Sequence, residues 1–294
     1  MIYGIKRVAR YLLGTDVAGR ALAVYPDDTF IVSYPRSGNT WTRFLVASLV
    51  RPAEPVSFAN IERIIPDAEA QSSRYLKRIP RPRVIKSHQY FDPRFKKVIY
   101  VVRDPRDVAL SYYDFQRKYR QIEDSYPTPR YIRDFVAGRL GTGDWGTWAE
   151  NVGSWLGARD GQPGFLLLRY EDLISETARE LARVADFLDI EVTPGLLATT
   201  IERGSAHRMR QLERNQASQW VSTKDKRPDI PFIRTASSGG WKKLLLPESA
   251  SEIESAWGPL MRRLGYELLT GRSERSQPES PEAARLVQES RGSS

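Results

Sequence analysis

The chain of 294 residues contains no cysteine, two histidines and three methionines. Without cysteine it can form neither a disulfide nor a thiolate zinc site, and thiol catalysis is excluded. The two histidines, His88 and His207, are too few for a multi-histidine metal centre. No apolar run approaches the ~20 residues that a membrane-spanning helix needs. The absence of cysteine suits a reducing compartment, so we expect a cytoplasmic protein that uses no metal.

What is present is the composition of a large folded domain with excess positive charge. Apolar residues make up 40% of the chain and include seven Trp and ten Phe, which is enough for a sizeable core. The formal net charge is +9. This charge fits an anionic ligand, a nucleic acid or an acidic membrane surface, and by itself it selects none of them.

Short apolar runs alternate with helical patterns, which is typical of α/β proteins. The expected strands are 29–33, 83–87, 98–102 and 165–169. Helices are expected to begin at Thr40, Pro105, Glu176 and Pro247. Because runs such as 98–102 are continuously apolar, as strands buried on both faces tend to be, we predict a central parallel sheet flanked by helices. We assign this single domain to residues 29–270.

The two ends of the chain are expected to lie outside that domain. Residues 1–28 begin with a basic amphipathic pattern, which predicts a helix that caps the domain and also allows weak contact with a membrane surface. Residues 271–294 are rich in Ser, Glu, Arg and Pro and are predicted to be disordered. Within the domain, 121–129 and 222–240 are predicted loops, and the longer one is a candidate binding lid.

The most informative run is Ser33-Tyr34-Pro35-Arg36-Ser37-Gly38-Asn39-Thr40-Trp41, between an expected strand and an expected helix. Loop amides and a helix N-terminus attract a phosphate, Gly38 permits a tight turn, and Arg36 adds a fork of charged donors. The run therefore predicts a P-loop-like phosphate-binding strand-loop-helix. An ordinary strand-to-helix junction contains the same residue types, and the loop alone leaves that alternative open.

The loop differs from that of nucleoside triphosphatases, which reads G-x-x-x-x-G-K-[ST] and binds magnesium through its Ser/Thr. No glycine stands five positions before Gly38, and no Lys-Ser/Thr pair follows it. The sequence thus indicates a site for one phosphate without an obvious magnesium ligand.

A second junction follows the strand 98–102. Asp104 is a good N-cap, Pro105 a good first helical residue, and Arg103 places a cation at the sheet edge where α/β proteins bind ligands. Ser111 follows two turns along the helix and can present a hydroxyl to the same anion. The alternative is that Arg103 forms an ordinary ion pair.

Lys86 and His88 form a third element, because alternate residues of a strand share a face. The strand is expected to lie inside the sheet. A cation beside an imidazole depresses its proton affinity, yet near an anionic ligand a neutral histidine can accept a proton while the lysine stabilises developing negative charge. A structural histidine is the alternative.

A fourth element, Arg234 followed by Ser237-Ser238-Gly239-Gly240, is either a second phosphate clamp or a flexible loop.

In this order, the motifs resemble those of the cytosolic-type sulfotransferases, which use 3′-phosphoadenosine 5′-phosphosulfate (PAPS). The resemblance covers about residues 30–265. It is carried by 34–41, Lys86-Ser87-His88, Arg103 to Ser111, Gly146-Thr147-Trp148, Tyr170-Glu171-Asp172-Leu173, and Arg234 to Lys242. The family usually has Arg-Lys-Gly where this chain has Arg234-Thr235-Ala236, which implies a looser clamp on the 3′-phosphate. The dimer motif of vertebrate members is not recognisable.

The resemblance implies a role for each matching residue. His88 would be the base, with Lys86 and Arg36 stabilising the transferring and leaving groups. The residues implied at the 5′-phosphate are Arg36, Ser37, Gly38, Asn39 and Thr40. Those implied at the 3′-phosphate are Arg103, Ser111 and Arg234, and those at the adenine are Trp41, Tyr170 and Ser205.

We therefore hypothesise sulfuryl transfer from PAPS to a hydroxyl or amine of a small-molecule, glycan or lipid acceptor, with release of adenosine 3′,5′-bisphosphate (PAP). No metal, nucleic acid or stable protein partner is expected. The alternatives are a small-molecule or nucleotide kinase, a non-catalytic basic nucleotide- or nucleic-acid-binding protein, and an inactive member of the family. A kinase needs a magnesium ligand after Thr40 and an acidic strand end, where this sequence has Trp41 and Arg103.

Overall fold

A computed structural model of the chain describes residues 16–140, 145–233 and 237–269. The expected N-terminal helix and the C-terminal tail lie outside the described residues, as do Arg234, Thr235 and Ala236. The predictions made for them, and for the domain limits, therefore stay predictions.

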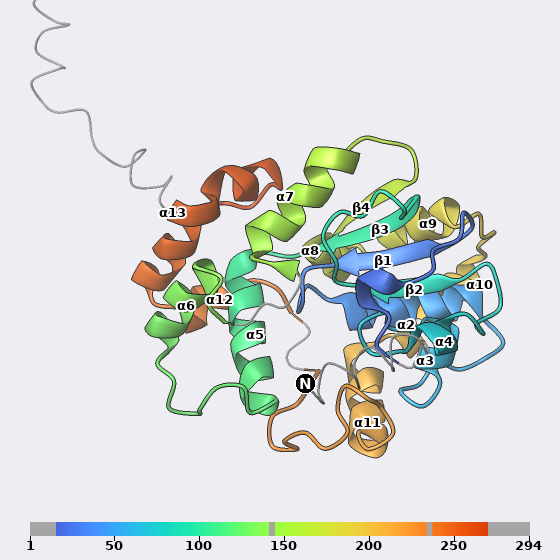
Figure 1. Cartoon of the computed structure of the whole chain (residues 1–294), viewed down its shortest axis with the longest axis horizontal. Coiled ribbons are helices and arrows are strands. Elements are labelled where there is room, and N and C mark those ends of the chain that lie inside the picture. The colour runs from blue at the N-terminus through green and yellow to red at the C-terminus, as the bar shows by residue number, and fades with distance from the viewer. Residues whose placement is uncertain (1–15, 141–144, 234–236, 270–294) are drawn as a thin grey trace, which may run out of the picture.

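The centre of the fold is a sheet of four parallel strands in the order β2-β1-β3-β4 (Figure 1). The strands are β1 (Thr29–Ser33), β2 (Val84–Ser87), β3 (Lys97–Val102) and β4 (Phe165–Arg169). Every residue of β1, and all of β3 after its first residue, is buried. The predicted α/β class and parallel sheet are confirmed, and each strand lies within one residue of its expected bounds.

The position of β2 corrects one expectation, because it is the edge strand and not an inner one. An irregular segment covers its outer side: the Lys86 amide donates to the Pro66 carbonyl oxygen at 2.9 Å, and the Ala68 amide donates to the Lys86 carbonyl oxygen at 3.0 Å. These bonds satisfy backbone groups that an open sheet edge would expose. They also place Asp67 beside Lys86.

Helices form most of the remaining regular structure in the described ranges. In chain order they are η1 (Gly19–Ala21, a 3₁₀ turn), α2 (Asn39–Val50), α3 (Ile61–Ile64), α4 (Ser73–Leu76), α5 (Pro105–Lys118), α6 (Thr128–Val136), α7 (Trp148–Arg159), α8 (Tyr170–Ser175), α9 (Thr177–Phe187), α10 (Pro194–Arg203), α11 (Ala206–Gln216), α12 (Trp241–Leu244) and α13 (Pro247–Arg263). None of them is both long and apolar enough to cross a membrane.

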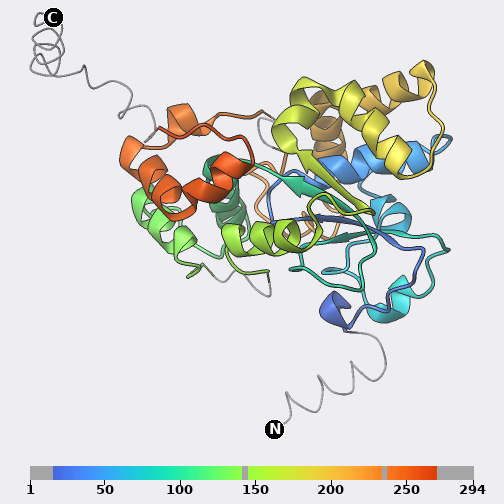
Figure 2. The ribbon, with the colours of Figure 1, turned by 90° about the horizontal axis from the view of Figure 1, so that it is seen from above.

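The helices cover the sheet on both faces, with α5, α6, α7 and α13 on one side and α2, α9, α10 and α11 on the other (Figures 1 and 2). Alternation along β1 produces two cores, since Phe30 and Val32 pack with the first set and Ile31 with the second. This three-layer arrangement leaves the carboxyl ends of the strands as the edge where loops meet.

The predicted starts of four helices are correct to within one residue: α2, α5, α9 and α13. The Asp104 carboxylate accepts a hydrogen bond from the Arg106 amide and caps α5, as expected. The described part of 222–240 contains no helix or strand. The loop expected over 121–129 ends earlier, because α6 already begins at Thr128.

Candidate active site

A cavity of about 680 Å³ opens at the carboxyl ends of β1, β2 and β3. Residues from the loop after β1, from β2 and from the loop after β3 line it together, although they are far apart in the sequence. Most of the predicted site residues line this one cavity: Arg36, Gly38, Asn39, Thr40, Trp41, Lys86, His88, Arg103, Ser111 and Tyr170.

The loop between β1 and α2 has the backbone geometry of a tight anion-binding turn. Gly38 has φ +101° and Arg36 has φ +68°, both in the left-handed region. A Cβ atom at Gly38 would lie 2.4 Å from Cδ2 of Tyr170, so glycine is required both by the backbone and by its neighbour. The Ser37 side chain is fully buried, and its hydroxyl has no hydrogen-bond partner among the described residues.

Arg36 links the loop to α5 and to the segment before residue 234. Its Nε donates to Ser111 Oγ at 3.2 Å and its Nη2 donates to the Phe232 carbonyl oxygen at 3.1 Å. The guanidinium also lies 5.1 Å from the ring centroid of Phe115 and 4.5 Å from that of Phe232. The structure therefore brings Arg36 and Ser111 together, with the cation flanked by aromatic rings.

Arg103, at the end of β3, lies behind the same loop. Its Nη1 donates to the Arg36 carbonyl oxygen at 3.4 Å, its Nη2 donates to the Ser237 carbonyl oxygen at 3.0 Å, and its guanidinium stacks 4.3 Å from the Tyr170 centroid. Its Nε has no hydrogen-bond partner among the described residues. Because its hydrogen bonds in the described residues go to carbonyl oxygens, the charge of Arg103 is available to an anion.

Trp41 and Tyr170 meet edge to face, with ring centroids 5.7 Å apart. The Trp41 indole donates to the Gly204 carbonyl oxygen at 2.8 Å, which ties α2 to the start of α11. Ser205 follows directly, but its hydroxyl caps α11 by accepting from the Arg208 amide, and Ser205 does not line the cavity. Its role at the adenine stays a prediction without support from position.

His88 follows β2 and is oriented by the backbone of β1. Its Nδ1 lies 2.7 Å from the Ser33 carbonyl oxygen. Because a carbonyl can only accept, Nδ1 carries the proton and Nε2 has the free lone pair. Burial, and then the charge of Lys86, lower the pKa of His88 from 6.5 to about 3, against smaller raising effects of Asp67 and of the bond to Ser33. The imidazole is thus neutral near pH 7.

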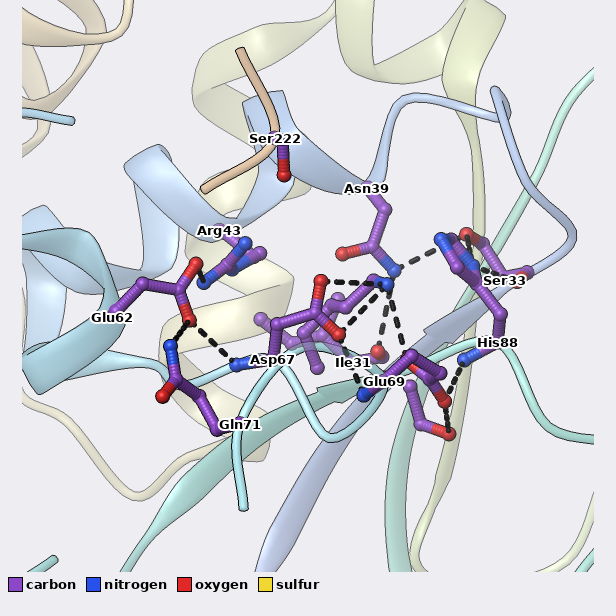
Figure 3. Close-up of polar contacts among 12 residues, drawn as sticks. Ile31, Ser33, Asn39, Arg43, Glu62, Asp67, Glu69, Gln71, His88 and Ser222 are labelled. Carbon is purple, nitrogen blue, oxygen red and sulfur yellow. Dashed lines mark hydrogen bonds and ion pairs between the residues drawn. The ribbon is translucent and has the colours of Figure 1, made fainter. Parts of the chain in front are cut away.

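Lys86 lies between two carboxylates that were not predicted from the sequence. Its Nζ lies 3.0 Å from both carboxylate oxygens of Asp67 and 3.1 Å from Oε2 of Glu69 (Figure 3). The other Glu69 oxygen, Oε1, accepts from the His88 amide at 2.9 Å and from Ser87 Oγ at 2.9 Å. Burial raises the pKa of Glu69, but the charge of Lys86, the contact with the Asp67 carboxyl, and the hydrogen bonds from the His88 amide and Lys86 outweigh it and keep that pKa below its usual range. Glu69 is therefore ionised.

Asp107 is a further residue that sequence reasoning missed, and it holds the segment after residue 236. The Asp107 carboxylate accepts from the Gly239 amide at 2.6 Å and from the Trp241 amide at 2.9 Å. Asp107 belongs to the motif around Arg103, so its position was visible, but the partner amides lie more than a hundred residues away. The bonds dock the start of α12 against α5, beside the arginine.

Aromatic side chains form a large part of the remaining cavity wall. His88 itself lies edge to face with Trp145, with centroids 5.8 Å apart. The aromatic residues lining this side are Tyr112, Phe115, Tyr119, Trp145, Trp220 and Phe232. The cavity therefore has a cationic part at Arg36 and Arg103, an acidic part at Asp67 and Glu69, and an aromatic wall.

Comparison with known proteins accounts for this arrangement. The family model described as "Sulfotransferase domain" matches residues 26–265. Sulfotransferase 1B1 of Canis lupus familiaris is 27% identical over 233 residues, which cover 74% of this chain and 77% of that protein. The 3-beta-hydroxysteroid sulfotransferase of Cavia porcellus is 28% identical over 246 residues, or 80% of this chain and 83% of that protein.

Solved structures show the same fold. A retinol dehydratase in complex with androsterone and inactive cofactor PAP superposes with a TM-score of 0.67 at 21% identity, covering 86% of this chain and 85% of that one. A mouse sulfotransferase complexed with PAP gives a TM-score of 0.64 at 22% identity, with coverages of 82% and 87%. Since the family model spans most of the sequence, including every strand of the sheet, this chain belongs to the sulfotransferase domain family.

Proposed function

We propose that this PAPS-dependent sulfotransferase moves the sulfuryl group to a hydroxyl or amine of a small-molecule acceptor by in-line displacement, with release of PAP. The observation that carries the proposal is the position of His88: a neutral imidazole with a free Nε2, in the same cavity as the loop after β1 and as Arg103. A base and an anion site in one cavity are what transfer from a phosphosulfate to an alcohol requires.

The residues present fit an adenosine bisphosphate. The buried Ser37 hydroxyl and Arg103 Nε have no partners among the described residues, and Arg103 otherwise donates only to carbonyl oxygens. These are donors that a phosphate would satisfy. Trp41 and Tyr170 supply aromatic surface for a purine. Arg36, Ser37, Gly38, Asn39 and Thr40 would bind the 5′-phosphate.

At the other phosphate, Arg103 and Ser111 would bind the 3′-phosphate, together with Arg234, which lies outside the described residues. PAPS supplies an activated sulfuryl group whose bond to phosphate breaks as the bond to the acceptor oxygen or nitrogen forms. Ser205, next to the Gly204 carbonyl that binds Trp41, would contribute its hydroxyl as a donor, because in capping α11 this hydroxyl only accepts.

The proton of the acceptor would pass to Nε2 of His88. The Ser33 carbonyl keeps Nδ1 protonated and fixes the ring, so that Nε2 is the acceptor nitrogen throughout. Lys86 would stabilise charge on the transferring group, and Arg36 would stabilise the departing phosphate, as the family resemblance implies. In this chain Lys86 also carries two carboxylate partners, so only part of its charge is available to the sulfuryl group.

Membership of the sulfotransferase family does not favour the kinase or the nucleic-acid-binding alternatives. We propose a small-molecule acceptor in preference to a glycan or lipid, because the aromatic wall and the acidic part enclose a cavity of limited volume. A cytoplasmic location, the domain limits 29–270 and a disordered tail remain part of the proposal.

The test is incubation of the purified chain with PAPS and a panel of phenols, alcohols and amines, with mass-spectrometric detection of PAP. His88→Ala should abolish turnover while leaving PAP binding nearly unchanged by titration calorimetry. His207→Ala is the matched control, because His207 is exposed on α11 and should have no effect. Full activity of His88→Ala would remove it as the base. Stabilisation by magnesium-ATP but not by PAP would favour the kinase instead.

A further inference from the structure

The acidic part of the cavity, Asp67 and Glu69, can accept further hydrogen bonds besides those from Lys86. Asp67 is only 7% exposed and lines the cavity together with Glu69. Among the described residues, Asp67 Oδ2 and Glu69 Oε2 each accept one hydrogen bond, in both cases from Lys86 Nζ. Since a carboxylate oxygen accepts two hydrogen bonds, each of these oxygens retains an acceptor site.

The charge of this part of the cavity is negative. Two carboxylates face one ammonium, which leaves one negative charge in a poorly exposed environment. The neighbouring pair of Arg43 and Glu62, 3.0 Å apart, is neutral as a unit, and His88 is neutral. An uncompensated charge in such a place is unfavourable unless a ligand of opposite charge offsets it.

The side-chain oxygen of Asn39 is a third acceptor in this part of the cavity, and it independently indicates a ligand that donates hydrogen bonds. Nδ2 of Asn39 donates to the Ile31 carbonyl oxygen at 3.3 Å and to Ser33 Oγ at 3.1 Å. Because the Ile31 carbonyl can only accept, the atom of the Asn39 amide that faces it must be the nitrogen. The atom on the opposite side of the amide is therefore the oxygen, Oδ1. Asn39 is 5% exposed and lines the cavity, yet Oδ1 has no partner among the described residues. Figure 3 shows this oxygen turned to the side of Asp67.

We propose that the acceptor carries a protonated amine, which binds to the oxygens of Asp67, Glu69 and Asn39 while its hydroxyl faces His88. The proposal rests on the proposed function and adds the acceptor class to it. An ammonium donates three hydrogen bonds and accepts none, which matches the acceptor oxygens of Asp67, Glu69 and Asn39. An acceptor with a carboxylate on that side is excluded by like-charge repulsion.

The test compares three phenols that differ in the charge of one substituent: tyramine, 4-ethylphenol and 3-(4-hydroxyphenyl)propionate. Binding to the complex of the protein with PAP is measured by calorimetry, so that the result does not depend on turnover. Tyramine should bind about tenfold or more tightly than 4-ethylphenol, and the propionate more weakly than either. Where turnover is measurable, kcat/KM should follow the same order.

Asp67→Asn removes one charge with little change of shape and should reduce the preference for tyramine over 4-ethylphenol by about tenfold. Asp189→Asn is the matched control, because the Asp189 side chain is 86% exposed and does not line the cavity. It should leave the preference unchanged.

The outcomes separate this proposal from the proposed function. Absence of PAP binding and of PAP release from PAPS would overturn the proposed function. PAP binding with equal affinity for the three phenols, or with none of them bound, would overturn the amine proposal alone. An equal loss for tyramine and 4-ethylphenol in Asp67→Asn would also overturn it, and would make Asp67 a positioning residue for Lys86.

Discussion

The state of His88 leads to a sharp prediction about stability and pH. In the folded chain its pKa is lowered to about 3, first by burial and then by Lys86, whereas in the unfolded chain it has the ordinary value of 6.5. Between these values only the unfolded chain binds the proton. The contribution of His88 to the free energy of unfolding should therefore be close to zero above pH ~6.5. It should become increasingly destabilising as the pH is lowered from there toward ~3.

The magnitude follows from the two pKa values. A pH of about 5 lies about 1.5 pH units below the pKa of the unfolded imidazole. Protonation there stabilises the unfolded chain by about 2 kcal/mol, whereas the folded imidazole binds almost no proton. A folded pKa of about 4 would give nearly the same result, since the measurement is made above it. Near pH 7.5 the contribution is close to zero.

The assay is urea unfolding of the wild type and of His88→Asn at about pH 7.5 and about pH 5. Asparagine retains a donor for the Ser33 carbonyl but does not titrate. The wild type should lose about 2 kcal/mol more than the variant between the two conditions, while His207→Asn should behave like the wild type. An equal loss in wild type and His88→Asn would refute a depressed pKa and with it the neutral base.

Three further substitutions test the surrounding geometry. Gly38→Ala should lower the free energy of unfolding by about 2 kcal/mol or more and abolish PAP binding, since the new Cβ would lie 2.4 Å from Tyr170. Gly161→Ala is the control, because Gly161 also has a positive φ, +69°, but no atom within 4 Å of the new Cβ. In the same urea titration it should cost only about 1 kcal/mol. Arg103→Lys should weaken PAP binding by about tenfold in calorimetry, because an ammonium cannot reproduce the guanidinium fork, and unchanged affinity would remove it from the phosphate site. Lys86→Met should cost about 3–5 kcal/mol in chemical unfolding, because two carboxylates lose a buried counter-ion, and a loss below about 1 kcal/mol would contradict that pairing.

The parts of the fold that follow from local chemistry were predictable from the sequence. Short apolar runs identified all four strands, and Asp104 with Pro105 identified the start of α5, because caps and buried strands depend on neighbours in the chain. The loop at 34–38 was predictable for the same reason. Its glycine and its short length constrain the backbone whatever surrounds it.

The acidic part of the cavity was not predictable in this way. Asp67 and Glu69 lie in a segment without regular secondary structure, so no periodicity places them on a face. They reach Lys86 only because the segment pairs with the outer edge of β2. The assumption that β2 was an inner strand hid this, since an inner strand leaves no edge for such a segment to cover.

The position of Asp67 and Glu69 beside Lys86 also explains how a lysine can lie next to a histidine base. Burial lowers the pKa of His88 most, the charge of Lys86 lowers it further, and the charge of Asp67 raises it. As the acceptor loses its proton, an imidazolium forms at His88, and the carboxylates near Lys86 favour that cation instead of opposing it. The strength of the base therefore depends on its burial and on the balance of Lys86 against Asp67. An acceptor ammonium bound at Asp67 would shift this balance toward a weaker base, so the enzyme would favour acceptors whose hydroxyl is already acidic, as a phenol is, over simple alcohols.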